Sequence, residues 1–273
     1  MKKYLYCLYQ GIERAINYDG IEHAGYMSFM VLLALFPFLV FFLSLTSFFG
    51  AYQLGQNFIE IMIDSSPDYA IGSISSRLEE LKRLPPRGLL NLAIFGAIWT
   101  ASSFVEGLRT ILNRVLEVKS PPPYIARRLL SIFQFIILCF CLIMAMLIFV
   151  IIPTIVSVFN FSSLGYQKDM WGYYKDIYIF ISLFCCVLGF YTFIPNAKIS
   201  WVRMIPGAAF TTMSWQICGR FVSNYLSYYH QLSIVYGSLG NIIITLLFFY
   251  VVNFIFIVGA AYNYHLSIYE KRS

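Results

Sequence analysis

Long apolar runs alternate with short polar and basic connections along this 273-residue chain. Six runs come near the ~20 residues that an α-helix needs to cross ~30 Å of hydrocarbon. They cover residues 28–50, 89–110, 129–153, 177–195, 205–227 and 237–262. No alternating barrel pattern is present, and only closed helical hydrogen bonding lets such segments lie in lipid. The pattern predicts an all-α fold, a polytopic membrane bundle of about six transmembrane helices.

Residues 1–27 differ from these runs, because apolar side chains recur there at three- and four-residue steps. The positions concerned are Leu5, Leu8, Tyr9, Ile12 and Ile16. This spacing predicts a short helix over residues 2–17 with one apolar face. Lys2, Lys3 and Arg14 suit anionic headgroups. We therefore expect an amphipathic, interfacial helix on the inner leaflet.

The rest of the chain divides into a transmembrane domain, residues 28–262, and a short tail, residues 263–273. The longest connection within the domain is the predicted outer loop 51–88. Its apolar residues step by three and four up to a Pro-Pro pair, which predicts a helix that caps the outer face. Pro37 lies midway along the first run and predicts a kink there.

Basic residues give the orientation of the bundle. With the N-terminus inside, eleven Lys and Arg fall in inner segments and six in outer loops, four of these six within 51–88. Cytoplasmic loops carry the excess of basic residues in membrane proteins. We expect both termini in the cytoplasm, and the first run to act as an uncleaved anchor in a bacterial inner membrane.

Composition narrows the possible functions. Hydrophobic residues make up 59% of the chain and charged residues 12%, about half the charged fraction of a soluble domain. The net charge of +6 is spread over short loops and forms no basic face, which argues against a nucleic-acid partner. His23, His230 and His265 lie far apart, and the six cysteines show no metal-ligand spacing. We expect no cofactor, no metal site and no catalytic residue.

Three of the apolar runs carry polar stripes at helical spacing. The stripe of the second run comprises Ser102, Glu106, Arg109 and Asn113. That of the fifth comprises Thr212, Gln216, Arg220 and Asn224, and that of the sixth Asn241 and Thr245. An ionised residue at the centre of a span costs about 2.5–3.5 kcal/mol on insertion scales. We expect the stripes to turn away from lipid and toward one another.

Two interpretations of these stripes stay open. Glu106 and Arg109 can form an i,i+3 pair at a helix end, with Arg109 extending to the inner headgroups, and Arg220 can do the same outside. Alternatively the stripes line the pathway of a solute or lipid. At ~1.5 Å per residue Glu106 lies near the inner surface and Arg220 near the outer one, so we expect no direct pair between them.

Four stretches of sequence carry a resemblance to a known family. They are HAGYMSFMVLLALFPFLVFF (23–42), IWTASSFVEGLRTILNRVLEV (98–118), FIPNAKISWVRMIPGAAF (193–210) and SIVYGSLGNIIITLLFFYVVNFIFIVGAAYN (233–263). In this order they resemble the YihY/virulence factor BrkB family over nearly the whole chain. The resemblance implies a multi-pass inner-membrane protein with about six helices. This chain departs from the family at one position: where the family pattern is Gly-Ala-Glu, the sequence has Gly259–Ala260–Ala261.

The family formerly carried a ribonuclease label by misassignment. Some members are associated with serum resistance, and export of lipids or envelope components has been suggested. We therefore expect transport of a lipid or an amphiphilic envelope component, or a role in envelope integrity. A non-transporting scaffold that binds envelope partners through residues 51–88 is the alternative, and an enzyme ranks last. The expected partners are membrane lipids, with a second copy of the chain or an envelope protein also open.

Overall fold

A computed structural model of the chain describes residues 2–48, 90–118, 123–158, 168–197, 199–228 and 238–272. Within these ranges the chain forms α-helices and one 3-10 helix and no strand, which confirms the all-α prediction. The elements are α1 (Lys2–Asn17), α2 (Gly20–Phe48), α5 (Leu90–Val115), α6 (Tyr124–Val158), α7 (Lys168–Phe193), η2 (Trp201–Met204), α8 (Ile205–Tyr228) and α10 (Ser238–Arg272). The helix expected within the 51–88 loop lies outside the described residues.

Two helices of the described part are long and apolar enough to cross a membrane, through the segments Tyr124–Cys141 of α6 and Ile242–Tyr269 of α10. Shorter apolar segments, Gly20–Leu35 and Ile177–Phe193, lie in α2 and α7. The number of six spans therefore stays a proposal. Helix α2 continues through Pro37 as far as Phe48, and the kink there also stays a prediction.

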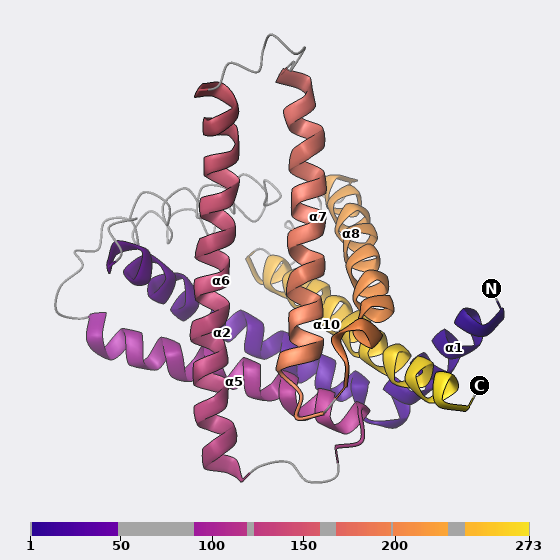
Figure 1. Cartoon of the computed structure of the whole chain (residues 1–273). Helices are drawn as coiled ribbons and strands as arrows, with labels where there is room; N and C mark the ends of the chain where they lie inside the picture. The colour runs from indigo at the N-terminus through magenta and orange to yellow at the C-terminus, as the bar shows by residue number, and fades with distance from the viewer. Residues whose placement is uncertain are drawn as a thin grey trace.

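Helices α2 and α5 pack along each other, and α5 also packs against α6, while α7 leads down to η2 and α8 and packs against both (Figure 1). Helix α10 packs against α1, α2, α5 and α8 and so contacts most of the lower part of the molecule. Both ends of the chain lie on the same side (Figure 1). That arrangement agrees with termini on one side of a membrane, and the side that they face stays a prediction.

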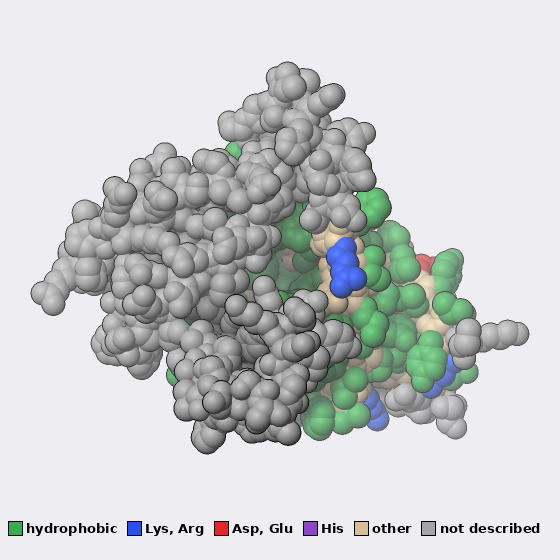
Figure 2. Space-filling view, turned by 90° about the horizontal axis from the view of Figure 1, so that it is seen from above, with side chains coloured by type: hydrophobic (Ala, Val, Ile, Leu, Met, Phe, Trp, Pro, Cys, Tyr) green, Lys and Arg blue, Asp and Glu red, His purple; other side chains and the backbone are tan. Residues whose placement is uncertain are grey.

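Apolar side chains fill the core and also cover much of the surface. The core contains Met27, Ile111, Leu112, Phe256 and Ile257, each at most 2% exposed. Figure 2 shows hydrophobic side chains over most of the described part of one face, with charged groups only in isolated places. Large apolar patches on a surface mark contact with lipid or with another protein. The described surface therefore suits apolar surroundings.

Helix α1 docks onto α10 through its small residues. Cys7, Gly11 and Ala15 step by four and are buried, and a Cβ at Gly11 would lie 3.0 Å from the backbone nitrogen of Tyr262. The apolar positions Leu5, Tyr9, Ile12 and Ile16 are instead 40–64% exposed. Most of the predicted apolar face is therefore turned away from the protein, whereas Leu8 is half-buried and packs against the core. The position of α1 on the inner leaflet stays a proposal, which this exposure supports.

Helices α8 and α10 approach each other closely where two glycines meet. A Cβ on Gly207 would overlap the carbonyl oxygen of Gly259, and a Cβ on Gly259 would overlap the Thr211 hydroxyl. Gly207 donates its backbone N–H to Asn263 Oδ1 at 2.7 Å, and Asn263 Nδ2 donates to the Met204 carbonyl at 3.1 Å. Small residues such as Gly207 and Gly259 let the backbones of α8 and α10 approach this closely, and the hydrogen bonds of the Asn263 side-chain amide stabilise the contact.

We predict that Gly207→Ala and Gly259→Ala each lower the free energy of unfolding by about 1–3 kcal/mol, because the added methyl group has no space. Gly219→Ala is the matched control on α8, since its Cβ would meet nothing within 4 Å. That control should leave stability unchanged or raise it by up to ~1 kcal/mol. Unfolding of the detergent-solubilised chain measures all three, and equal effects at Gly207 and Gly219 would contradict this account of the crossing.

Candidate functional site

The polar stripe of α5 is buried in the protein. Its four residues step by four, three and four and so share one face of the helix. Ser102 and Arg109 are fully buried, and Asn113 is 7% exposed. The Glu106 side chain is 15% exposed. The structure thus places the predicted residues of this helix toward the interior.

Arg109 is the centre of a hydrogen-bond network that joins three segments of the chain. Its guanidinium binds groups of α5, of α6 and of the segment after α7. Nε donates to the Ile194 carbonyl at 3.1 Å, and Nη2 donates to Gln134 Oε1. Nη1 faces three acceptors, namely the Arg127 carbonyl at 2.7 Å, Ser131 Oγ at 2.9 Å and Glu106 Oε2 at 3.2 Å. All three nitrogens are therefore occupied, as a buried charge requires.

Glu106 is the counter-charge of the network. Its Oε2 lies 3.2 Å from Arg109 Nη1 and 2.8 Å from Ser131 Oγ. Its Oε1 lies 3.4 Å from Arg127 Nε. Gln134 continues the network by donating from Nε2 to the Phe193 carbonyl at 2.5 Å, at the end of α7. One carboxylate thus faces two guanidinium groups, which leaves the network with a net positive charge.

Asn113 links α5 to the connection between α7 and η2. Its Nδ2 donates to Asn196 Oδ1 at 3.0 Å, and the backbone N–H of Asn196 donates to Asn113 Oδ1 at 2.7 Å. The two amides belong to the motifs LNR (112–114) and IPN (194–196). These two motifs, 83 residues apart in sequence, are therefore in direct hydrogen-bond contact.

The ends of α1 and α5 are joined by two crossed ion pairs. Arg14 lies 2.9 Å from Glu117, and Arg114 pairs with Asp19. Each acid follows the end of one helix and binds the arginine in the last turns of the other. Both acids adopt left-handed backbone angles, φ 58° at Asp19 and 55° at Glu117. At Glu117 this conformation closes the α5 C-terminus, with Val118 N–H donating to the Asn113 carbonyl at 2.9 Å.

Glu117 also accepts hydrogen bonds from Tyr264 at 2.5 Å and from Tyr18 at 3.0 Å. The Tyr264 hydroxyl and Arg14 lower the pKa of the Glu117 carboxyl to about 2. Arg14 stacks on the Tyr264 ring, 3.7 Å from its centre, and donates from Nε to the Val115 carbonyl at 2.9 Å. The carboxylate is thus held ionised and in a fixed orientation.

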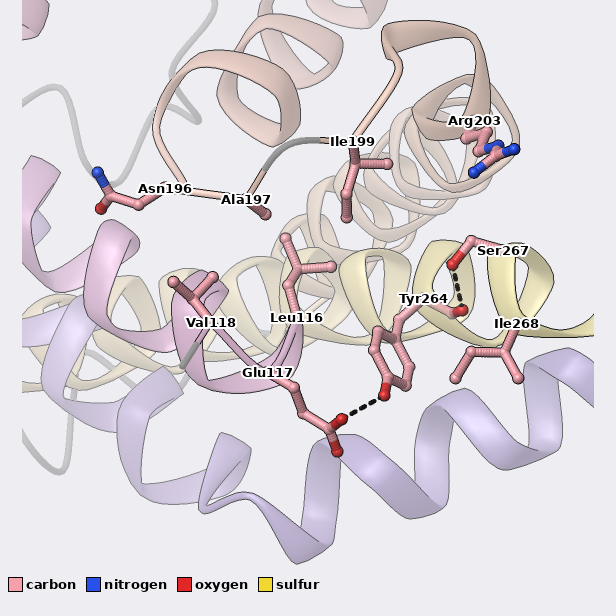
Figure 3. Close-up of a pocket in the computed structure, with 10 residues that line it drawn as sticks. All are labelled: Leu116, Glu117, Val118, Asn196, Ala197, Ile199, Arg203, Tyr264, Ser267 and Ile268. Carbon is pink, nitrogen blue, oxygen red and sulfur yellow. Dashed lines mark hydrogen bonds between the residues drawn. The ribbon is translucent and has the colours of Figure 1, made fainter. Parts of the chain in front are cut away.

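A pocket of about 400 Å³ opens beside Glu117. The end of α5, residues 196–197 and 199–203, and the C-terminal part of α10 form its walls (Figure 3). Apolar side chains line it together with four polar ones, Glu117, Asn196, Arg203 and Ser267. A mixed lining of this size is typical of sites for small organic ligands.

The predicted residues of α8 and α10 lie apart from this network. Thr212 is fully buried and donates to the Ala208 carbonyl at 2.8 Å, Gln216 is half-buried, and Arg220 is exposed. Thr245 is half-buried. The side chains of Asn224 and Asn241 lie outside the described part. The structure therefore joins Glu106 to Arg109, whereas Asn113 pairs with Asn196 and Ser102 donates to the Trp99 carbonyl at 3.0 Å. The α8 stripe runs from the core to the surface.

The partners of Arg109 on α6 were not predicted from the sequence. Arg127, Ser131 and Gln134 step by four and three, and this spacing was a usable signal of a polar stripe. Of the first interpretation of the stripes, the i,i+3 pair of Glu106 and Arg109 is present. Arg109 does not extend to the headgroups, because its side chain is fully buried. Asn196 was not predicted either, since its partner Asn113 lies 83 residues away in sequence, on α5.

The chain was compared with families and with individual proteins. Residues 12–273 match the family model described as Virulence factor BrkB. "Putative ribonuclease-like protein YfkH" of Bacillus subtilis (strain 168) is 28% identical over 249 residues, 90% of each chain. A "UPF0761 membrane protein" of Pseudoalteromonas atlantica is 23% identical over 260 residues, 92% of this chain and 83% of the relative. No solved structure matches.

We predict that Glu106 and Arg109 are energetically coupled. Arg109→Gln should cost about 3–5 kcal/mol of unfolding free energy, because it leaves Glu106 and the other acceptors poorly paired. Glu106→Gln also destabilises, and the double variant should lose about 1–3 kcal/mol less than the sum. Arg220→Gln, at an exposed site, is the control and should change stability by less than ~0.5 kcal/mol. Additive losses in detergent unfolding would disprove the coupling.

We predict that the contribution of Glu117 disappears at low pH. Its folded-state pKa is lowered, so the stabilisation is complete above the ordinary carboxyl pKa near 4.5 and is lost as pH falls toward about 2. Because the carboxylate is 47% exposed, Glu117→Gln should cost no more than about 1 kcal/mol at pH 7. Unfolding of both proteins at pH 7, 5 and 3 should show that this difference shrinks. A constant difference would contradict the assignment.

Proposed function

We propose that this chain, which belongs to the virulence factor BrkB family, moves a lipid or an amphiphilic envelope component across the bacterial inner membrane. Its relatives include proteins named as membrane proteins, and two of its described helices are long and apolar enough to cross a membrane. The cargo class and the transport step are our proposal, and so is a contribution to envelope integrity.

The observation that carries the proposal is the polar edge of α8. Thr212 lies in the core, Gln216 is half-buried, and Arg220 is exposed, so polar groups follow the helix from interior to surface. Next to this edge Ile217 is 69% and Phe221 72% exposed. An amphiphile needs both surfaces at once, because its headgroup loses water while its chains stay in apolar surroundings.

The α5 network supports a different role in the same protein. Arg109 uses all three guanidinium nitrogens on protein groups, and both carboxylate oxygens of Glu106 face arginines. A passing headgroup would have to break these contacts, which makes the network a costly place for cargo. We therefore assign Glu106, Arg109 and Asn113 to holding α5, α6 and the segment after α7 together, and the pathway to α8.

We do not extend the words ribonuclease-like, in the name of the Bacillus relative, to this chain. Glu106 is paired with Arg109 and Arg127, and Glu117 with Arg14, so neither carboxylate of the site is free to act as a base. Among the described residues, no group of three or more His, Cys, Asp or Glu could hold a metal ion. A transport function needs neither a free carboxylate base nor a bound metal ion.

Reconstituted vesicles test the proposal. Vesicles that contain the purified chain and a fluorescent phospholipid in both leaflets are treated with dithionite, which bleaches only the outer leaflet. We expect the wild-type chain to speed the loss of the protected signal. Gln216→Leu/Arg220→Leu should slow this loss about tenfold, since a barrier raised by ~1.4 kcal/mol slows a step tenfold.

Met213→Leu/Phe221→Leu is the matched control, because both side chains are exposed on α8 and stay apolar. It should transport at the wild-type rate within about twofold. Wild-type transport by Gln216→Leu/Arg220→Leu at unchanged stability would disprove the pathway on α8. Loss of cellular function on deletion of residues 66–86, with both α8 variants intact, would instead support a scaffold that acts through the outer loop.

A further inference from the structure

We propose that the pocket beside Glu117 binds the phosphate of an anionic phospholipid headgroup, with Arg203 as the anion ligand. The inference deepens the proposed function by naming a headgroup class, and it rests on that function for its place in transport. The pocket holds about 400 Å³, within the usual range for a site that takes a small organic group.

Among the described residues that line the pocket, Arg203 is the cation whose charge is not compensated. Glu117 is engaged by Arg14 at 2.9 Å and by the hydroxyls of Tyr18 and Tyr264. Among the described residues, by contrast, no carboxylate pairs with Arg203, whose side chain is exposed. Figure 3 shows Glu117 and Arg203 at opposite sides of the pocket. The electrostatic field therefore favours an anion on the Arg203 side.

Arginine suits a phosphate because its planar guanidinium can donate two parallel N–H groups to two phosphate oxygens. Ser267 lies on the same side of the pocket as Arg203 (Figure 3), and its Oγ already donates to the Tyr264 carbonyl at 2.8 Å. Arg203 is thus the donor on which the site depends.

Apolar side chains form the remaining wall. Leu116 and Val118 follow the end of α5, and Ile199 comes from the segment before η2. Figure 3 shows Leu116 and Ile199 pointing toward each other across the pocket. A fully hydrated inorganic ion gains nothing from such a wall, whereas the glycerol and first methylene groups of a phospholipid do.

The position of the pocket fits a headgroup. It lies against the end of α10 onto which α1 packs, and α1 exposes Leu5, Tyr9, Ile12 and Ile16. Helices with such an apolar face lie at the boundary between headgroups and acyl chains. The pocket therefore opens at the level of the phosphates in the proposed arrangement.

Native mass spectrometry of the full chain in detergent tests the inference without transport. The probe is dioleoylphosphatidylglycerol, and dioleoylphosphatidylcholine is the zwitterionic comparison. We expect tighter binding of phosphatidylglycerol, and an apparent Kd raised about tenfold in Arg203→Gln, since one charge-assisted hydrogen-bond pair is lost. Arg203→Lys should restore part of the affinity. Ser267→Phe, which fills the pocket and leaves Arg203 in place, should also weaken binding about tenfold.

Arg114→Gln is the matched control, because it removes one positive charge from the partly exposed end of α5 and does not line the pocket. It should change the apparent Kd less than twofold. Equal losses in Arg114→Gln and Arg203→Gln would assign the binding to overall charge and overturn the site. Displacement of lipid by millimolar inorganic phosphate, with the same dependence on Arg203, would assign the pocket to a soluble anion and overturn the lipid.

The two proposals can fail separately. Retention of phosphatidylglycerol that depends on Arg203, in a protein that moves no lipid in vesicles, would support this site and refute the transport function. Transport of lipid without any effect of Arg203→Gln or Ser267→Phe on retention would refute the site and leave the function standing.

Discussion

The burial of one positive charge constrains the rest of this structure. Arg109 is fully buried on α5, and a guanidinium there is stable only while protein groups replace its water. Its partners come from α6 and from the Ile194 carbonyl just after α7. Three segments must therefore meet at one point for any of them to be stable. The remaining contacts of this region follow from that meeting.

Two further sets of polar contacts lie near the C-terminal end of α5. Asn113 binds Asn196, and the crossed pairs Arg14–Glu117 and Arg114–Asp19 connect the ends of α1 and α5. Close to them α8 and α10 cross at Gly207 and Gly259. Polar joints and close backbone contacts thus fix one end of the bundle. The described parts of α6 and α8 expose apolar side chains, which suit contact with lipid.

Several of these features could be predicted from the sequence. The apolar runs predicted the helices, and the spacing from Ser102 to Asn113 predicted a polar stripe that turned out to be buried. The network around Arg109 could not be predicted fully, because a single amide such as Gln134 in an apolar run gives no sign of its partner. The close contact of Gly11 with α10 could not be predicted from the sequence either. Periodicity marks the apolar face of α1, but the smallest side chains decide where a helix can approach another one.

The packing of α1 on α10 has a consequence for how the protein is made. Residues 2–17 contact a helix that begins at Ser238, so α1 leaves the ribosome long before its partner α10 is made. At ~5–20 residues per second this interval lasts on the order of ten seconds or more. During that time the small-residue face of α1 has no partner within the chain, and its apolar face is the part that can already hold it to the membrane. The early segment would then serve as a tether for the nascent chain before it becomes part of the finished fold.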